Sequence, residues 1–406
     1  MYISQITLKN VRCFEHLPIR IAKLGNSVVI AGDNGDGKTS LLRSIALGLC
    51  DHASSAALLR ELPGDFVRRG QAEPATITID LTMPGGRVFR TRTLVRRLKH
   101  FEQLKQEQFV DRKPLSEARF PWEKIFVCGY GAGRSTSGAL DIENYSAMDA
   151  LYCLFRYDEP LQNSELAIRR LMDEAYYRHG GLKAAKRVSK RIRSLLKSVL
   201  HRSGKITIER SGIMIAGKWG KYNVRSCSDG YGAMTTVVLD MVNWLLLYNS
   251  CIDPSQMKGI VLIDEIEQHL HPIWQQNVMR LLRAAFPKTQ FIVTTHSPLV
   301  LSGCKGLQIV RLGDAQPENL GDLYGWKAED VYRRMGLESS RPKEMQDLIE
   351  EYKRLYLELL RKRARPSQRK RLKKIQATVS HIPGMGFEAT KAKLNSISEL
   401  TKRPRR

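Results

Sequence analysis

The sequence predicts an α/β fold in which a parallel sheet carries a phosphate-binding loop. Three short apolar segments rich in β-branched residues read as strands buried on both faces: Val28–Ala31, Gly259–Ile263 and Phe291–Thr295. The first is followed by a glycine-rich turn and then by apolar residues at helical spacing. Polar residues follow directly at the ends of the other two. This order of strand, turn and helix is the context that a phosphate-binding loop requires.

The glycine-rich turn has the letters GDNGDGKTS and matches G-x-x-x-x-G-K-[ST]. Its backbone N–H groups would face a phosphate, and the following helix would add the positive end of its dipole. Lys38 would reach the β- and γ-phosphates, and the Thr39 hydroxyl would reach Mg²⁺. A chance glycine-rich turn is the alternative, which the flanking strand and helix disfavour. The predicted nucleotide-binding residues are Gly32, Asp33, Asn34, Gly35, Asp36, Gly37, Lys38, Thr39 and Ser40.

An acidic pair, Asp264 and Glu265, ends the second buried strand. Two carboxylates in that place are costly without a cation, so they predict a Mg²⁺ and water site beside the P-loop. We predict that Asp264, the Walker-B residue, contacts Mg²⁺ directly or through water. Glu265 is the predicted general base that orients and deprotonates the attacking water.

A histidine, His296, follows the third buried strand. In a nucleotide-binding fold it could hydrogen-bond the γ-phosphate, and taken alone it is more often a core or turn histidine. With Lys38 and Glu265 it completes the set of predicted catalytic residues.

Together with the segment CSDGYG (Cys227–Gly232), these motifs resemble the ABC class of ATPases. Within that class the chain is similar to the soluble SMC, RecF and OLD-type heads. The opening Ile3–Phe14 looks like the start of that branch. The segments DEIEQHLHPIWQ, TTHSPLVL and YGAGR resemble small bacterial members, including ATPase components of anti-phage systems such as Septu, PARIS and retron modules. The resemblance covers residues 1–325 and implies an ABC-type P-loop NTPase head, with ATP and Mg²⁺ as cofactors.

The resemblance also implies that two heads meet head to tail. Each ATP would lie between the P-loop of one chain and the signature loop of the other, which Ser228, Asp229 and Gly230 would supply. Cys227 and Asp229 depart from the usual L-S-G-G-Q, and an Asp near a triphosphate is unfavourable unless it points away. The alternative is a Ser-Asp-Gly turn that caps a helix.

A further glycine-rich turn follows the predicted strand at Ile125 and leads to Arg134. It is where a sensing loop of the family could lie, although no glutamine there is clearly that of the family. Arg134 would then approach phosphate or Mg²⁺-bound water. An exposed arginine after a structural glycine turn is the equally open alternative.

Composition agrees with a cytoplasmic ATPase that is not embedded in a membrane. No run of 18 apolar residues is present, and the first residues lack a signal-peptide pattern. The seven cysteines are scattered without a C-x-x-C pair, so they indicate neither a zinc site nor a disulfide framework.

Basic residues are strongly clustered, and the formal net charge is +25. Residues 177–205 carry ten Lys and Arg and no acid, with apolar residues at helical spacing. Residues 341–406 carry nineteen Lys and Arg against seven acids, including Arg361–Arg363, Arg369–Arg371 and Lys402–Arg406. These clusters predict a surface that binds nucleic acid through its backbone, with a solvated helix face or an acidic protein partner as the alternatives.

The predicted organisation is an ATPase head over residues 1–325 and a basic helical region over residues 326–406. The head contains an antiparallel β lobe with a hairpin around Pro84–Gly86, a helical insertion over residues 141–205 and a strand pair over 206–225. In the second region, Lys327–Arg334 and Glu344–Arg363 are predicted helices.

The function favoured by the sequence is an ATP-gated homodimer or higher oligomer that senses nucleic acid or a phage component and controls a separate effector, a nuclease or toxin. No nuclease signature is visible in the chain itself. The alternatives are the ATPase subunit of a transporter and an ATPase of DNA repair or recombination. A signature without glutamine and the RecF-like start speak against the transporter.

Overall fold

The computed structural model describes residues 1–22, 26–99, 101–134, 142–200, 205–209, 212–217, 220–223, 229–250, 253–313, 316–336, 343–360 and 365–379. The chain divides into two compact units, residues 1–335 and 336–406. The boundary predicted after residue 325 stays a prediction. Helix α10 (Ala328–Arg334) packs against α9 (Pro298–Ser302) within the first unit.

A six-stranded sheet with the order β15-β14-β3-β13-β12-β8 forms the centre of the first unit. All neighbouring pairs are parallel except β14 with β15. The three strands predicted to be buried on both faces are β3, β12 and β13, and every residue in them is buried. The bounds are β3 (Val28–Ala31), β8 (Val127–Tyr130), β12 (Gly259–Ile263), β13 (Thr289–Thr295), β14 (Gln308–Arg311) and β15 (Glu318–Asn319).

A second, antiparallel sheet has the order β2-β1-β4-β5-β6-β7. Its central hairpin pairs β4 with β5 from Thr82 and Val88 onward, which confirms the predicted turn between them. The bounds are β1 (Tyr2–Val11), β2 (Phe14–Arg20), β4 (Ala75–Thr82), β5 (Val88–Arg97), β6 (Glu102–Val110) and β7 (Lys113–Leu115).

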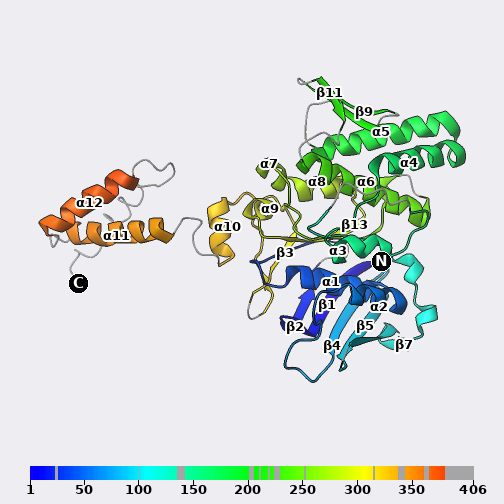
Figure 1. The fold of residues 1–406 in the computed structure, drawn as a ribbon, viewed down its shortest axis with the longest axis horizontal. Coiled ribbons are helices and arrows are strands. Elements are labelled where there is room, and N and C mark those ends of the chain that lie inside the picture. The colour runs from blue at the N-terminus through cyan, green and yellow to red at the C-terminus, as the bar shows by residue number, and fades with distance from the viewer. Residues whose placement is uncertain are drawn as a thin grey trace. The chain divides into compact units, whose positions relative to one another are not determined.

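Helix α1 (Lys38–Leu49) joins the two sheets (Figure 1). It contacts β4 and β5 of the antiparallel sheet as well as β12 and β13 of the parallel sheet. Leu41, Leu42 and Ile45 are fully buried in the core that both sheets share. Helix α2 (His52–Arg60) follows, and the Asp51 carboxylate caps it by accepting the N–H of Ser54. The P-loop helix is thus fixed by hydrophobic burial on two sides.

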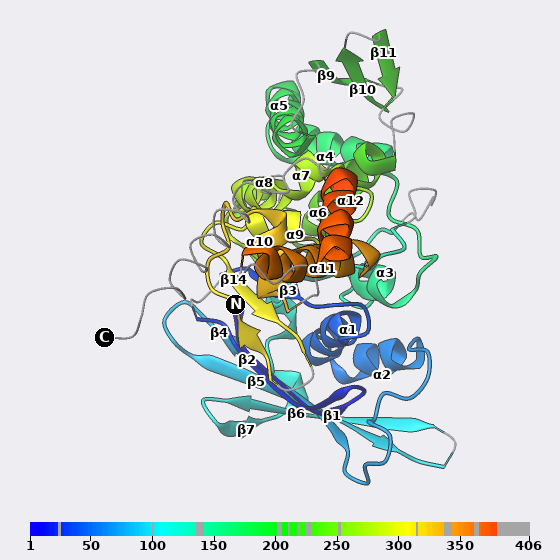
Figure 2. The ribbon, with the colours of Figure 1, turned by 90° about the vertical axis from the view of Figure 1, so that its left-hand side faces the viewer.

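Helices α4 and α5 lie at the opposite end of the first unit from the antiparallel sheet (Figures 1 and 2). The sequence predicts one strand pair after residue 205, whereas the structure has a three-stranded antiparallel sheet, β11-β10-β9. These strands are β9 (Lys205–Glu209), β10 (Gly212–Gly217) and β11 (Gly220–Asn223). The helices are α3 (Tyr152–Phe155), α4 (Ser164–Arg178), α5 (Gly181–Leu200), α6 (Asp229–Asn249), α7 (Pro272–Gln275) and α8 (Val278–Ala285). Short 3₁₀ turns are η1 (Glu117–Arg119), η2 (Trp122–Lys124), η3 (Asp149–Leu151) and η5 (Pro254–Gln256).

The second unit contains a pair of helices, α11 (Lys343–Leu360) and α12 (Pro366–Val379). A small core of Tyr352, Leu355, Tyr356, Leu372 and Ile375 holds the pair together. The sequence predicts α11 but not α12, whose few apolar residues stand among a run of basic ones. Residues 361–363 and 402–406 lie outside the described part of the chain. Among the described helices, none has the length and apolar character needed to span a bilayer.

Helix α6 is tied to strand β8 by a buried carboxylate, Asp240. The Tyr130 hydroxyl donates to one carboxylate oxygen of Asp240 at 2.8 Å, and the Gln162 N–H donates to the other at 3.0 Å. Burial raises the pKa of Asp240 to about 6, because desolvation outweighs the hydrogen bonds from Tyr130, Gln162 and Trp244. The folded protein therefore binds a proton at Asp240 more tightly than the unfolded chain does.

We expect this carboxylate to make stability fall as the pH rises. Its contribution is full below the unfolded pKa and is lost as the pH passes the folded pKa of about 6. Relative to Asp240→Asn, the wild-type free energy of unfolding should fall by about 1–2 kcal/mol between about pH 5 and about pH 8. Denaturant unfolding of both proteins at the two pH values measures the difference. Identical pH dependence in the two proteins would contradict it.

Candidate functional site

The P-loop leaves the end of β3 and enters α1 through Gly37, which has φ of 84°. A Cβ on Gly37 would lie 2.4 Å from the Cys13 sulfur and 2.6 Å from the Phe14 ring, so this position requires glycine. Within the loop, the Asp33 N–H donates to an Asp36 carboxylate oxygen at 2.6 Å. Asp33, Asn34 and Gly35 are exposed, and the loop is therefore open to a ligand at its tip.

Lys38 folds back over this loop. Its ammonium donates to the carbonyl oxygens of Gly32 at 3.1 Å and of Asp33 at 2.8 Å, and only 6% of the residue is exposed. An ammonium has three N–H donors, so these two bonds orient it and leave a third for a phosphate oxygen. The lysine is held in place by the loop that it is predicted to serve.

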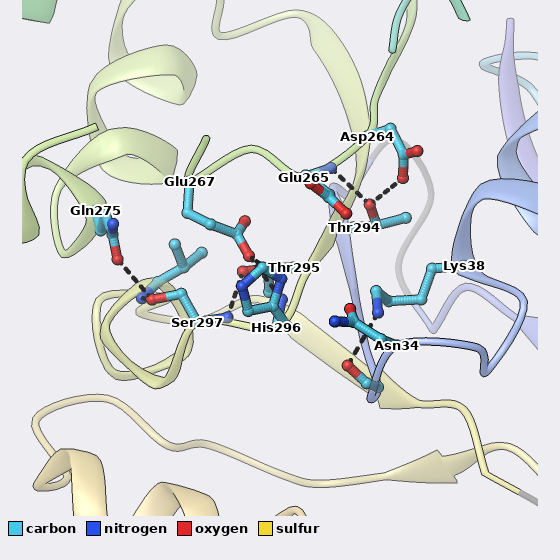
Figure 3. A network of polar contacts seen from close by, with 12 residues as sticks. Asn34, Lys38, Asp264, Glu265, Glu267, Gln275, Thr294, Thr295, His296 and Ser297 are labelled. Carbon is cyan, nitrogen blue, oxygen red and sulfur yellow. Dashed lines mark hydrogen bonds and ion pairs between the residues drawn. The ribbon is translucent and has the colours of Figure 1, made fainter. Parts of the chain in front are cut away.

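Asp264 connects the P-loop helix to the end of β12. Figure 3 shows its carboxylate hydrogen-bonded to Thr294. The Thr39 hydroxyl donates to one carboxylate oxygen at 2.6 Å, and the Thr294 hydroxyl donates to the other at 2.5 Å. Asp264 is 2% exposed. Because β13 is the strand next to β12 in the sheet, Thr294 fixes the Asp264 carboxylate from the neighbouring strand.

The residues fit a magnesium ion. Mg²⁺ in nucleotide sites takes one or two protein oxygens, several waters and the substrate phosphates. The Thr39 hydroxyl and the Asp264 carboxylate offer such oxygens side by side. Among the described residues, no cluster of three or more His, Cys, Asp or Glu could hold a metal by itself.

Glu265 adopts a left-handed backbone conformation with φ of 44°. For a residue with a Cβ this conformation costs roughly 1–2 kcal/mol, so its surroundings must stabilise it. Its N–H donates to the Thr294 hydroxyl at 2.8 Å, and its carbonyl accepts from Arg134 at 2.8 Å. The predicted base therefore has its main chain bound on both sides.

Arg134 is buried against the main chain of the acidic pair, and its predicted approach to phosphate or Mg²⁺-bound water stays a prediction. The residue is 5% exposed, so the structure corrects the exposed arginine. Its guanidinium donates to the main-chain carbonyls of Gly131, Asp264 and Glu265. Desolvation lowers the pKa of Arg134, while the negative charges of Asp264, Glu265 and other nearby groups oppose that change.

His296 follows β13 and is paired with a residue that the sequence analysis does not single out, Glu267. One Glu267 carboxylate oxygen accepts the His296 backbone N–H at 2.7 Å and lies 3.1 Å from its ring Nδ1 (Figure 3). The His296 side chain is 49% exposed, so it is not a core histidine. Next to it, Ser297 caps α9 and donates to Gln275 at 2.7 Å. The sequence signal that could have pointed to Glu267 is its position, because it is a third carboxylate two residues after Glu265.

The structure brings together Lys38, Thr39, Asp264, Glu265 and His296 at one edge of the parallel sheet. β3, β8, β12 and β13 are parallel, so their carboxyl ends meet at this edge. Ser228 lies outside the described residues, and Asp229 and Gly230 begin helix α6. Their contact with a nucleotide on another chain stays a prediction.

Two protein-family models match parts of the chain. One is described as "AAA domain" and matches residues 5–119. The other is described as "AAA domain, putative AbiEii toxin, Type IV TA system" and matches residues 241–302. The first match covers the P-loop, and the second covers the acidic pair and His296.

Two similar curated proteins cover most of the chain. The Septu protein PtuA of Bacillus mycoides is 26% identical over 402 residues, which are 95% of this chain and 51% of that protein. The Retron Ec83 probable ATPase of Escherichia coli is 26% identical over 444 residues, covering 87% and 80%. The chain thus spans about half the length of the Septu protein.

Among solved structures, the SMC head domain from Thermotoga maritima has a TM-score of 0.47 and 15% identity, with 78% of this chain and 97% of that chain covered. The mainly parallel sheet, with the P-loop between β3 and α1, gives the chain the fold of a P-loop ATPase. The matching AAA-domain models and the relatives named as probable ATPases support ATPase activity for this chain. They confirm the resemblance to ATPases of anti-phage systems.

Thr294 provides a test of the hydrogen-bond network. Thr294→Val keeps the shape but leaves the Glu265 N–H and one Asp264 oxygen without their partner, which should destabilise the protein by about 1–3 kcal/mol. The affinity for Mg²⁺–ATP should fall as well, because the carboxylate loses its orientation. Thr294→Ser, which keeps the hydroxyl, should bind normally. Thermal unfolding and calorimetric titration measure the two effects.

Thr91→Val is the matched control. Thr91 is also fully buried, and its hydroxyl donates to the Gly48 carbonyl at 2.7 Å, away from the P-loop and the acidic pair. This variant should lose comparable stability but bind Mg²⁺–ATP like the wild type. If Thr294→Val binds as tightly as Thr91→Val, the threonine does not orient the site.

Proposed function

We propose that the chain is an ATP-hydrolysing switch that works in anti-phage defence. The observation that carries the ATPase part is the 2.6 Å hydrogen bond between Thr39 and Asp264, residues 225 positions apart in the sequence. It joins a phosphate-binding loop to a strand-end carboxylate that a second hydroxyl already orients. The relatives named Septu and retron support the defence setting.

Hydrolysis would proceed by attack of water on the γ-phosphorus. Glu265 would accept a proton from that water as the new P–O bond forms and the bond to the bridging oxygen of ADP breaks. The Lys38 ammonium would hold the phosphates through the donor that the loop leaves unused. His296, oriented by Glu267, would donate to a γ-phosphate oxygen. When bound at Thr39 and Asp264, Mg²⁺ would neutralise charge on the phosphates.

We further propose that two heads dimerise around ATP and that this dimer controls a separate effector, a nuclease or toxin. The predicted signature residues Ser228, Asp229 and Gly230 would then act on the nucleotide of the opposite chain. The basic clusters in residues 177–205 and 341–406 would bind nucleic acid, and they support nucleic acid as the trigger. The location of such a machine would be cytoplasmic. The same ATPase cycle could serve DNA repair or recombination, and the two settings differ in the effector rather than in this site.

The first test concerns the general base. Glu265→Gln should bind ATP with nearly wild-type affinity and hydrolyse it about 10²- to 10⁴-fold more slowly, because an amide cannot accept the proton. Lys38→Ala should instead weaken ATP binding. Phosphate release and equilibrium nucleotide binding measure the two steps, and replacement of the exposed Glu15 by Gln is the control. Wild-type turnover in Glu265→Gln would remove Glu265 from the role of base.

The same variant reports on dimerisation. If ATP closes two heads and its hydrolysis opens them, Glu265→Gln with Mg²⁺–ATP should accumulate as a dimer, whereas Lys38→Ala should not. Mass photometry with and without ATP gives the mass of each species. An unchanged mass of Glu265→Gln upon ATP addition would count against closure by ATP.

The best-described part of the basic surface lies on α5. Its apolar residues Ala185, Val188 and Ile192 face the protein core. The basic ridge consists of exposed side chains that form no ion pair among the described residues: Lys183, Lys186, Arg187, Lys190 and Lys197. Tyr177, which is 80% exposed, packs edge to face on Tyr176 at the end of α4. Exposed aromatic rings can stack on bases, so these tyrosines, a few residues before the basic ridge in the sequence, favour nucleic acid over an acidic protein.

In the second unit the basic residues are partly used by the fold. Arg371 forms two hydrogen bonds to the Glu351 carboxylate, at 2.9 and 2.7 Å. That pair joins α12 to α11, and its arginine is not available to a phosphate. The exposed Arg369, Lys370 and Lys373 would add to nucleic-acid binding.

Replacement of the five ridge residues by Gln should weaken nucleic-acid binding and flatten its dependence on salt. Each phosphate contact contributes a log–log slope of about −0.7 to −0.9, so fewer contacts give a shallower slope. Basal ATP hydrolysis should remain, because the ridge is not part of the P-loop edge. Fluorescence anisotropy with labelled single-stranded and duplex oligonucleotides at several salt concentrations provides the measurement.

The control removes the same number of charges from the antiparallel lobe and its neighbouring loops. Those exposed residues are Arg20, Arg96, Arg112, Lys113 and Lys124. If the control weakens binding as much as the ridge variant, the effect is one of net charge. If wild type shows no binding at low salt, with or without ATP, direct sensing of nucleic acid by this chain is wrong.

A further inference from the structure

The left-handed conformation of Glu265 depends on two neighbours that hold opposite sides of its main chain. Thr294 holds the N–H side and simultaneously orients Asp264. Arg134 holds the carbonyl side, where its Nη2 atom donates to the carbonyls of both Asp264 and Glu265. The turn after β12 sets the direction of the Glu265 side chain. One guanidinium, that of Arg134, holds this turn by binding its two carbonyls.

Arg134 reaches this place because of the turn that follows β8. Gly131 donates its N–H to the Cys153 carbonyl at 3.1 Å, and its own carbonyl accepts from Arg134 Nε at 3.0 Å. A Cβ on Gly133 would lie 1.8 Å from the Tyr157 carbonyl oxygen, so the chain passes too closely for any other residue. The glycine-rich turn therefore carries the arginine beneath the adjacent strand end.

The burial of this guanidinium is costly and its partners are neutral. Arg134 is 5% exposed, and among the described residues it forms no ion pair within 4.0 Å. Within the described part of the chain, its hydrogen bonds go to main-chain carbonyls. An isolated buried charge is strongly unfavourable unless hydrogen bonds compensate it. An apolar residue would fill this space at lower cost but could not bind two successive carbonyls.

We propose that Arg134 is a positioning residue for ATP hydrolysis, which aims the Glu265 carboxylate by binding the carbonyls of Asp264 and Glu265. The inference rests on the proposed function of Glu265 as the general base. Arg134 acts through Glu265 and touches neither the substrate nor the attacking water. Lysine cannot replace it, because one ammonium nitrogen cannot both hold the Gly131 carbonyl, as Nε of arginine does, and reach the Asp264 and Glu265 carbonyls, as Nη2 does.

The test combines Arg134→Lys with Glu265→Gln. Arg134→Lys keeps the positive charge, so ATP affinity should stay within about twofold of wild type while kcat falls by tenfold or more, since small misplacements of a catalytic group cost up to about 10²-fold. In the Glu265→Gln background the same substitution should cause almost no further loss, because the group that it positions is already inactive. Pre-steady-state phosphate release and nucleotide titration supply kcat and affinity.

Arg97→Lys is the matched control. Arg97 Nη2 also donates to a main-chain carbonyl, that of Val67, but it lies on the antiparallel sheet. This variant should keep wild-type kcat. Thermal unfolding of all variants separates loss of folding from loss of position, and Arg134→Gln, which removes the buried charge but keeps an amide donor, provides a second folded variant with the same expected fall in kcat.

Three results would overturn the proposal. One is wild-type kcat in folded Arg134→Lys and Arg134→Gln. Another is an equal further loss in the Glu265→Gln background, which would show that Arg134 acts independently of Glu265. The third is failure of both variants to fold, which would make the residue purely structural. Wild-type turnover in Glu265→Gln alone would instead contradict the proposed function.

Discussion

The site depends on one buried carboxylate, that of Asp264. Taking a carboxylate out of water is expensive, and this one is compensated by two hydroxyl donors, Thr39 on the P-loop and Thr294 on the strand between. These two hydrogen bonds join the P-loop helix to the acidic pair and fix the orientation of the carboxylate, and fixed polar groups are what electrostatic preorganisation requires.

The parallel sheet makes this arrangement possible. Because β13 stands between β3 and β12, its end supplies Thr294 to the acidic pair after β12, and His296 follows just beyond. On the other side of β12, β8 delivers Arg134 from below. Four adjacent strands thus bring site residues to a single edge, and helix α1 packs that edge against the antiparallel sheet through the shared core. A shift of the turn after β8 would therefore move the main chain of the acidic pair, because Arg134 binds the carbonyls of Asp264 and Glu265.

The sequence predicts the parts of this site whose chemistry is local. The P-loop and the acidic pair are contiguous motifs, and buried strands reveal themselves as unbroken apolar runs. Arg134, Thr294 and Glu267 are different, because their importance comes from partners that only the fold brings near. A threonine inside an apolar strand reads as a β-former, and an arginine after a glycine turn reads as exposed. The sequence does not predict helix α12, for a related reason. Its core residues Leu372 and Ile375 pack on α11, and they are too few to give a recognisable helical pattern of apolar residues.

The dependence of ATP hydrolysis on Mg²⁺ concentration tests the account most directly, when it is measured for wild type, Thr39→Ser and Thr39→Val. If the Thr39 hydroxyl and the Asp264 carboxylate hold the cation together, Thr39→Ser should need as much Mg²⁺ as wild type. Thr39→Val should need about tenfold more or fail to reach full activity. An unchanged Mg²⁺ requirement in folded Thr39→Val would contradict the claim that these two oxygens form the metal site.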